Sequence, residues 1–175
     1  IVQPDHVIIT DVSIGHIEGL KSLENIVEEK ASICSGQKQK GLAIIPSSIE
    51  KFSQLRAKVR NFGPDVISFG YNVSSDVRIS NIEVSGNAIT STIVDQKQKS
   101  WNVNLKTAGK HYMKNAAGLL ALVSSLNLDL SKAILSLQSW SPLAGRGQVL
   151  EVKLKASDYR TVSYTHLTLP TSRSV

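Results

Sequence analysis

The chain has 175 residues, 41% of them hydrophobic and 19% charged, which is the balance of an ordinary globular protein and excludes a disordered one. Lysine and arginine outnumber aspartate and glutamate by 20 to 14, which gives a formal net charge of +6. These basic residues are scattered and lack interleaved aromatic residues, so we expect no nucleic-acid partner.

Two further features of the sequence bear on its compartment. No stretch approaches the roughly 18 apolar residues needed to span a bilayer, so we expect no membrane insertion. The single cysteine, Cys34, excludes an internal disulfide and fits a reducing compartment, and we therefore expect a cytoplasmic protein. The chain starts with Ile1 rather than Met, directly before an apolar run, which indicates that the sequence begins inside a fold.

The first part of the chain predicts strands and helices in alternation. Apolar runs rich in β-branched residues predict buried strands at residues 7–10, 41–45 and 65–70. Helices are predicted from Leu23 to about Cys34 and over residues 49–59, the second capped by Ser47 and Ser48. This alternation favours right-handed βαβ units, and therefore an α/β fold with a mostly parallel sheet.

The pattern changes in the second half. Three runs of alternating or β-branched character, separated by turn residues, predict a small antiparallel meander between residues 76 and 105. Helical periodicity returns over residues 111–128 and 130–140. The turn-rich segment 141–148 predicts a domain boundary, and the apolar segment 149–154 predicts the first strand of another α/β domain. We therefore expect a partial central domain over residues 1–143 and the start of a C-terminal domain over residues 144–161.

The tail, residues 162–175, has a different origin in our interpretation. Its segment "VSYTHLTLPT" resembles the translation of an adapter used in sequencing libraries. We expect the native sequence to end near Arg160, and His166 is therefore not considered a site residue.

Lys30 interrupts an apolar helical stripe. The recurrence i, i+3, i+4, i+7 places it on one face with Leu23, Ile26, Val27, Ala31 and Cys34. Burying an unpaired ammonium group there is costly. His16 lies in the loop past the carboxyl end of the first strand, the edge at which open α/β sheets bind ligands. Two interpretations stay open: the two residues converge on one site, or His16 is an ordinary loop residue and Lys30 extends its amine to water.

The segment "GKHYMKNAAG" is the second candidate site. His111 at a helix start and Asn115 one turn later present backbone N–H groups and an amide that suit an anionic or purine ligand. Arg146, flanked by glycines in the linker, can clamp a phosphate in bidentate fashion. Each feature also has a purely structural explanation, because exposed amides at helix starts and arginines in turns are common. The sequence contains no G-x-x-x-x-G-K-[ST] phosphate loop.

Taken together, "PDHVIITDVSIGHIEGLKSLENIVEEKASI", "SFG", "GKHYMKNAAGLLAL" and "PLAGRGQ" resemble the Mur ligases over about residues 1–160. The resemblance is closest to the branch that joins D-alanyl-D-alanine to UDP-N-acetylmuramoyl-tripeptide in peptidoglycan precursor synthesis. It implies the C-terminal part of a central ATPase domain, a monomer, and an ATP-dependent ligase. In the implied reaction, the tripeptide carboxylate receives the γ-phosphate of ATP, and the D-alanyl-D-alanine amine then attacks the acyl phosphate.

The resemblance also implies a role for each candidate residue. The lysine at the position of Lys30 is typically carbamylated by carbon dioxide, which converts a neutral amine, the form that burial favours, into an oxygen ligand. The carbamate and His16 then hold Mg²⁺ at the ATP phosphates. His111 and Asn115 are implied to lie beside the adenine nucleotide, and Arg146 near the phosphates at a domain hinge.

The sequence departs from the family's pattern where relatives commonly have asparagine, at Asp11, Pro46 and Tyr112. The UDP-substrate domain, the phosphate loop and an acidic metal ligand are expected before Ile1, so we expect the 175-residue chain to be inactive alone. Two alternatives stay open. One is a ligase like folylpolyglutamate synthase, which shares the fold and has "EKAGI"-like sequence at its modified lysine. The other is a non-catalytic basic binding module.

Overall fold

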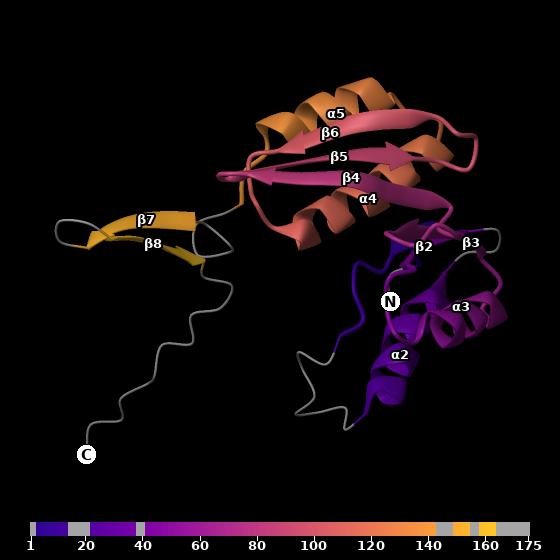
Figure 1. Cartoon of the computed structure of the whole chain (residues 1–175). Helices are drawn as coiled ribbons and strands as arrows, with labels where there is room; N and C mark the ends of the chain where they lie inside the picture. Colours follow the sequence, from indigo (N-terminus) through magenta and orange to yellow (C-terminus); the bar gives the residue numbers. More distant parts are fainter. Residues whose placement is uncertain (1–2, 14–21, 38–40, 143–148, 155–157, 164–175) are drawn as a thin grey trace, which may run out of the picture.

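The computed structural model describes residues 3–13, 22–37, 41–142, 149–154 and 158–163, and its centre is one six-stranded sheet (Figure 1). The strands lie in sequence order: β1 (His6–Ile8), β2 (Leu42–Pro46), β3 (Asp65–Gly70), β4 (Val77–Ser85), β5 (Ala88–Val94) and β6 (Ser100–Leu105). The helices are α2 (Leu23–Ser32), α3 (Phe52–Asn61), α4 (Lys110–Ser125) and α5 (Leu130–Ser139), and a short 3-10 turn (Ile33–Gly36) follows α2. The α/β fold expected from the sequence is confirmed.

Strands β1 to β4 run parallel, as the apolar runs predicted for the first three of them. Leu42 of β2 is in register with His6 of β1 and with Asp65 of β3. Strand β1 is shorter than predicted: it ends at Ile8, although Ile9 still donates a backbone hydrogen bond to Ile44 of β2 at 2.9 Å and is buried. The apolar run at residues 7–10 is therefore not a measure of the length of β1, because Ile9 is still buried although the strand ends at Ile8.

Helices α2 and α3 cover one face of the parallel strands (Figure 1). The buried side chains of this cluster include Val7, Ala43, Ile45, Ile26, Val27, Leu55 and Val59. Ser22 caps α2, and its hydroxyl accepts a hydrogen bond from the Asn25 backbone N–H at 3.2 Å. An ion pair of 2.8 Å between Lys51 and Glu24 links α3 to α2.

The start of α3 differs from the prediction. The helix begins at Phe52, later than expected, and no side chain caps it. Ser47 and Ser48 are used by the end of β3 instead. The Ser47 hydroxyl donates to the Phe69 carbonyl at 2.9 Å, and the Ser48 hydroxyl accepts from the Tyr71 backbone N–H at 2.7 Å. These serines therefore join neighbouring strand ends rather than starting a helix.

Helices α4 and α5 cover the other face of the sheet. The buried face of α4 consists of small and apolar side chains: Met113, Ala116, Ala117, Leu120 and Ala121. Gly118 allows close packing on β3, because a Cβ atom there would lie 3.0 Å from the ring of Phe69, which is fully buried. Helix α5 contains no fully buried residue and packs against α4 and β6.

Strands β4, β5 and β6 form the predicted antiparallel meander. In the C-terminal region, β7 (Val149–Leu154) pairs with β8 (Asp158–Ser163) in a separate antiparallel sheet, which confirms the strand predicted at residues 149–154. Residues 143–148, where the sequence predicts a domain boundary, and residues 164–175 of the tail lie outside the described residues. Among the described helices, none has the length and apolarity needed to cross a membrane.

Candidate functional site

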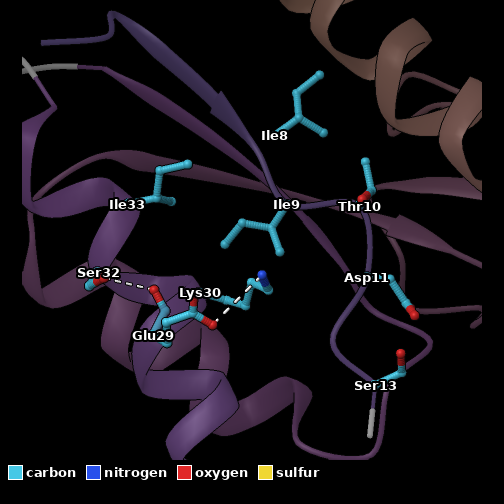
Figure 2. Close-up of a pocket in the computed structure, with 9 residues that line it drawn as sticks. All are labelled: Ile8, Ile9, Thr10, Asp11, Ser13, Glu29, Lys30, Ser32 and Ile33. Carbon is cyan, nitrogen blue, oxygen red and sulfur yellow. Dashed lines mark hydrogen bonds and ion pairs between the residues drawn. The ribbon is translucent and has the colours of Figure 1, made fainter. Parts of the chain in front are cut away.

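A pocket of about 640 Å³ lies at the carboxyl end of β1, where the loop after the strand faces the last turn of α2 (Figure 2). Thr10, Asp11 and Ser13 line the loop side, and Glu29, Lys30 and Ile33 line the helix side. This is the edge of an α/β sheet at which ligands usually bind.

Lys30 lies in this pocket and is not buried, although it belongs to the apolar helical stripe, which agrees with the open interpretation in which its amine extends to water. Val27 and Ala31 are fully buried, whereas 46% of the Lys30 side-chain surface is exposed. The reason is that the turn of α2 carrying Lys30 faces the pocket (Figure 2). Its amine lies 3.7 Å from the Glu29 carboxylate, an exposed pair that contributes little to stability. The open pocket therefore gives small molecules access to the Lys30 amine.

Asp11 lies on the loop side of the pocket and forms an ion pair with Lys114 of α4. Partial burial acts to raise the pKa of Asp11, but the hydrogen bond and charge of Lys114, with hydrogen bonds from Ser13 and the Val12 backbone, outweigh it. The pKa of Asp11 therefore lies below its ordinary value. In Figure 2 the Asp11 side chain points away from Lys30. The ionised carboxylate is thus engaged with α4 rather than with the amine across the pocket.

The first turns of α4 border a second, mainly apolar pocket of about 230 Å³. Asn115 lines it together with Tyr112 and Trp140, whose ring centroids lie 5.1 Å apart. The His111 ring packs on the Tyr112 ring at a centroid distance of 4.0 Å, so both predicted α4 residues lie near this pocket. Partial burial and the charge of Lys114 lower the pKa of His111, which keeps its imidazole neutral at pH 7.

Two predicted site residues, His16 and Arg146, lie outside the described residues. The convergence of His16 and Lys30 on one site therefore stays a prediction, as does the position of Arg146 near a phosphate.

The first pocket suits Mg²⁺ in part. Hydroxyl and carboxylate residues line it, and oxygen is the ligand that Mg²⁺ prefers. Over the described ranges, however, no three histidine, cysteine, aspartate or glutamate residues are grouped so as to hold a metal ion. A carbamate on Lys30 would add oxygen ligands on the α2 side. Binding of Mg²⁺ in the first pocket therefore depends on a carbamate at Lys30 and on His16.

The family model of the Mur ligase middle domain matches residues 1–123, which include β1 to β6 and most of α4. The chain belongs to the Mur ligase family. The matched part of this Mur ligase chain contains Lys30, Asp11 and the α4 residues His111 and Asn115.

Two curated relatives of this chain carry the names of different ligases. The chain is 26% identical over 146 residues to a UDP-N-acetylmuramoyl-tripeptide:D-alanyl-D-alanine ligase of Haemophilus influenzae, covering 83% of the chain and 31% of the relative. It is 28% identical over 109 residues to a UDP-N-acetylmuramate:L-alanine ligase of Halorhodospira halophila, covering 62% of the chain and 22% of the relative. The Mur ligase chain thus spans less than a third of either relative's length.

Solved structures agree on the fold. Crystal structure I of MurF from Acinetobacter baumannii superposes with a TM-score of 0.76 at 21% identity, over 86% of this chain and 32% of that one. The apo form of L. casei FPGS superposes with a TM-score of 0.70 at 17% identity, over 94% of this chain and 39% of that one. At these identities the likeness establishes the fold that the Mur ligase chain shares with both proteins.

Sequence patterns did not single out Lys114, which forms an ion pair with Asp11 of the first pocket, or Trp140, which lines the second pocket of this Mur ligase chain. A signal for Lys114 was available, since it is a charged residue between Met113 and Ala116, which belong to the buried face of α4. Asp11 was noted only as a departure from the family. Its position directly after the strand predicted at residues 7–10 is a signal that points to a site residue.

Proposed function

We propose that this chain is the middle part of an ATP-dependent ligase that adds D-alanyl-D-alanine to UDP-N-acetylmuramoyl-tripeptide in peptidoglycan precursor synthesis. The observation that carries this proposal is the position of Lys30. Its side chain lines a pocket at the carboxyl end of β1, within the matched Mur ligase region. The likeness to the Haemophilus influenzae ligase over 83% of the chain supports the choice of substrates. We place the enzyme in the cytoplasm, consistent with a free, buried Cys34.

In the proposed reaction, a carboxylate oxygen of the UDP-linked tripeptide attacks the γ-phosphorus of ATP, and the bond to the β-phosphate oxygen breaks to release ADP. The D-alanyl-D-alanine amine then attacks the acyl carbon of the resulting acyl phosphate. Phosphate leaves and the amine loses a proton, which completes the amide bond. Lys30 as its carbamate and His16 would hold Mg²⁺, and the ion would neutralise charge on the transferred phosphoryl group.

The second pocket supports a place for the nucleotide base. A purine has apolar faces and a polar edge, and the pocket combines the rings of Tyr112 and Trp140 with the Asn115 amide. We propose that Asn115 and His111 lie beside the adenine, and that Arg146 reaches the phosphates from the linker.

A second candidate differs in the substrates and not in the chemistry. The 28% identity to the Halorhodospira halophila ligase favours an enzyme that joins L-alanine to UDP-N-acetylmuramate. The folylpolyglutamate synthase alternative rests on the shared fold of the L. casei FPGS and on the "EKAGI"-like sequence around Lys30. The non-catalytic binding module does not explain the match to the Mur ligase middle domain.

A substrate panel tests the proposal. The complete product of the gene that encodes this chain would be incubated with Mg²⁺-ATP and each of three pairs: UDP-N-acetylmuramoyl-tripeptide with D-alanyl-D-alanine, UDP-N-acetylmuramate with L-alanine, and folate with glutamate. We expect ADP release and a new amide product, detected by mass spectrometry, with the first pair. A product formed only with the second or third pair would assign the corresponding alternative. If ATP is not consumed with any of the three pairs, the ligase proposal is contradicted.

A further inference from the structure

Asp11 and Lys114 connect the two pockets. Asp11 lines the pocket that contains Lys30, and Lys114 lies on α4 directly before Asn115, which lines the second pocket. The two charged residues are 103 positions apart in the sequence. Among the described ion pairs, theirs alone involves no residue of α2. The pair therefore joins the loop after β1 to a helix on the other face of the sheet.

The Lys114 end of this pair is well shielded from water. Only 13% of the Lys114 side-chain surface is exposed, compared with 44% for Asp11. An ammonium group so far removed from water is costly without a partner, and within the described ranges its ion-pair partner is Asp11. The Asp11 carboxylate therefore ties the loop after β1 to α4 through its ion pair with Lys114.

We infer that Asp11 and Lys114 are a positioning pair that sets the distance between the Lys30 pocket and the start of α4. This inference rests on the proposed function. A nucleotide with its base near Asn115 and its phosphates near Lys30 extends across both pockets. A shift of α4 relative to the loop changes the distance that this nucleotide must bridge.

The steady-state test uses the complete gene product with the preferred substrate pair of the panel. The variants are Asp11→Asn, Lys114→Gln and the exchanged double variant Asp11→Lys/Lys114→Asp. We expect each single variant to raise KM for ATP and to lower kcat/KM about 10- to 100-fold, because displacements of about 1 Å can slow a reaction about 100-fold. The exchanged variant restores most of the loss. Glu24→Gln, which removes the exposed ion pair to Lys51, is the matched control and leaves KM for ATP unchanged.

The outcomes separate three explanations. A raised KM for ATP in both single variants, with recovery in the exchanged variant, supports the positioning pair. Wild-type KM in both single variants overturns it. A raised KM for ATP in Lys114→Gln but not in Asp11→Asn also overturns it, because Lys114 would then contact the nucleotide directly.

A second measurement does not depend on ligase activity. Urea unfolding of the complete gene product compares wild type, Asp11→Asn, Lys114→Gln and the double variant Asp11→Asn/Lys114→Gln. We expect the double variant to be less destabilised than the sum of the single variants, since one interaction is lost in all three. If the two substitutions have additive effects on the free energy of unfolding, the inference that Asp11 and Lys114 act as a pair is overturned. If the wild-type gene product ligates no substrate while the coupling is present, the proposed function fails and the structural link between loop and helix stands.

Discussion

The contact between Gly118 of α4 and Phe69 of β3 leads to a prediction about stability. A Cβ atom at Gly118 would lie 3.0–3.3 Å from three atoms of the Phe69 ring, and this ring is fully buried. Replacing glycine by alanine inside a helix normally stabilises by about 1 kcal/mol. Overfilling a packed core costs about 1–3 kcal/mol. We therefore expect Gly118→Ala to destabilise the chain by about 1 kcal/mol, the reverse of the usual effect.

A double-mutant cycle with Phe69→Leu checks this reasoning. The smaller side chain removes the ring that the new methyl group meets, so adding Gly118→Ala to Phe69→Leu should stabilise by about 1 kcal/mol. Urea unfolding of the four proteins, followed by far-UV circular dichroism, measures each free energy of unfolding. If Gly118→Ala stabilises the wild-type background as much as the Phe69→Leu background, the close approach of α4 to β3 is not as described.

Three further predictions concern the strand ends and the pockets. Gly70→Ala should destabilise by about 1–3 kcal/mol in urea unfolding, because Gly70 has φ +154° and a Cβ atom would lie 2.4 Å from the Ser48 hydroxyl oxygen. Folding lowers the pKa of Asp11, so its ionised form stabilises the chain at neutral pH and loses this effect as the pH falls below about 4. The difference in unfolding free energy between wild type and Asp11→Asn should accordingly shrink when unfolding is measured at about pH 3 instead of pH 7. Trp140→Ala should weaken ATP binding to the complete gene product by about tenfold in calorimetry, because it removes one wall of the second pocket.

The order and type of the elements could be predicted because they depend on local patterns. Short β-branched runs separated by amphipathic helices specify βαβ units, and residues 65–70 form the strand that the pattern predicts. Boundaries were less accurate where tertiary contacts decide them. Ser47 and Ser48 have the composition of a helix cap, but the neighbouring end of β3 uses their hydroxyls.

The candidate site was predictable in position but not in its environment. The sequence places Lys30 on an apolar helix face, yet it does not say whether that face meets a strand or a pocket. The Asp11–Lys114 pair joins residues 103 positions apart, so no local pattern contains it. Its existence depends on how β1 and α4 pack against the rest of the sheet.

The proposed function requires that Lys30 serve the ATP-dependent ligase reaction through a carbamate. The most direct measurement is the rate of amide formation by the complete gene product with UDP-N-acetylmuramoyl-tripeptide and D-alanyl-D-alanine, for wild type and Lys30→Ala, with and without formate or acetate. We predict product formation by wild type, a loss of at least about 100-fold in Lys30→Ala, and partial recovery with the added carboxylates, which replace the missing oxygen ligands. Full activity of Lys30→Ala without added carboxylate would contradict this role of Lys30.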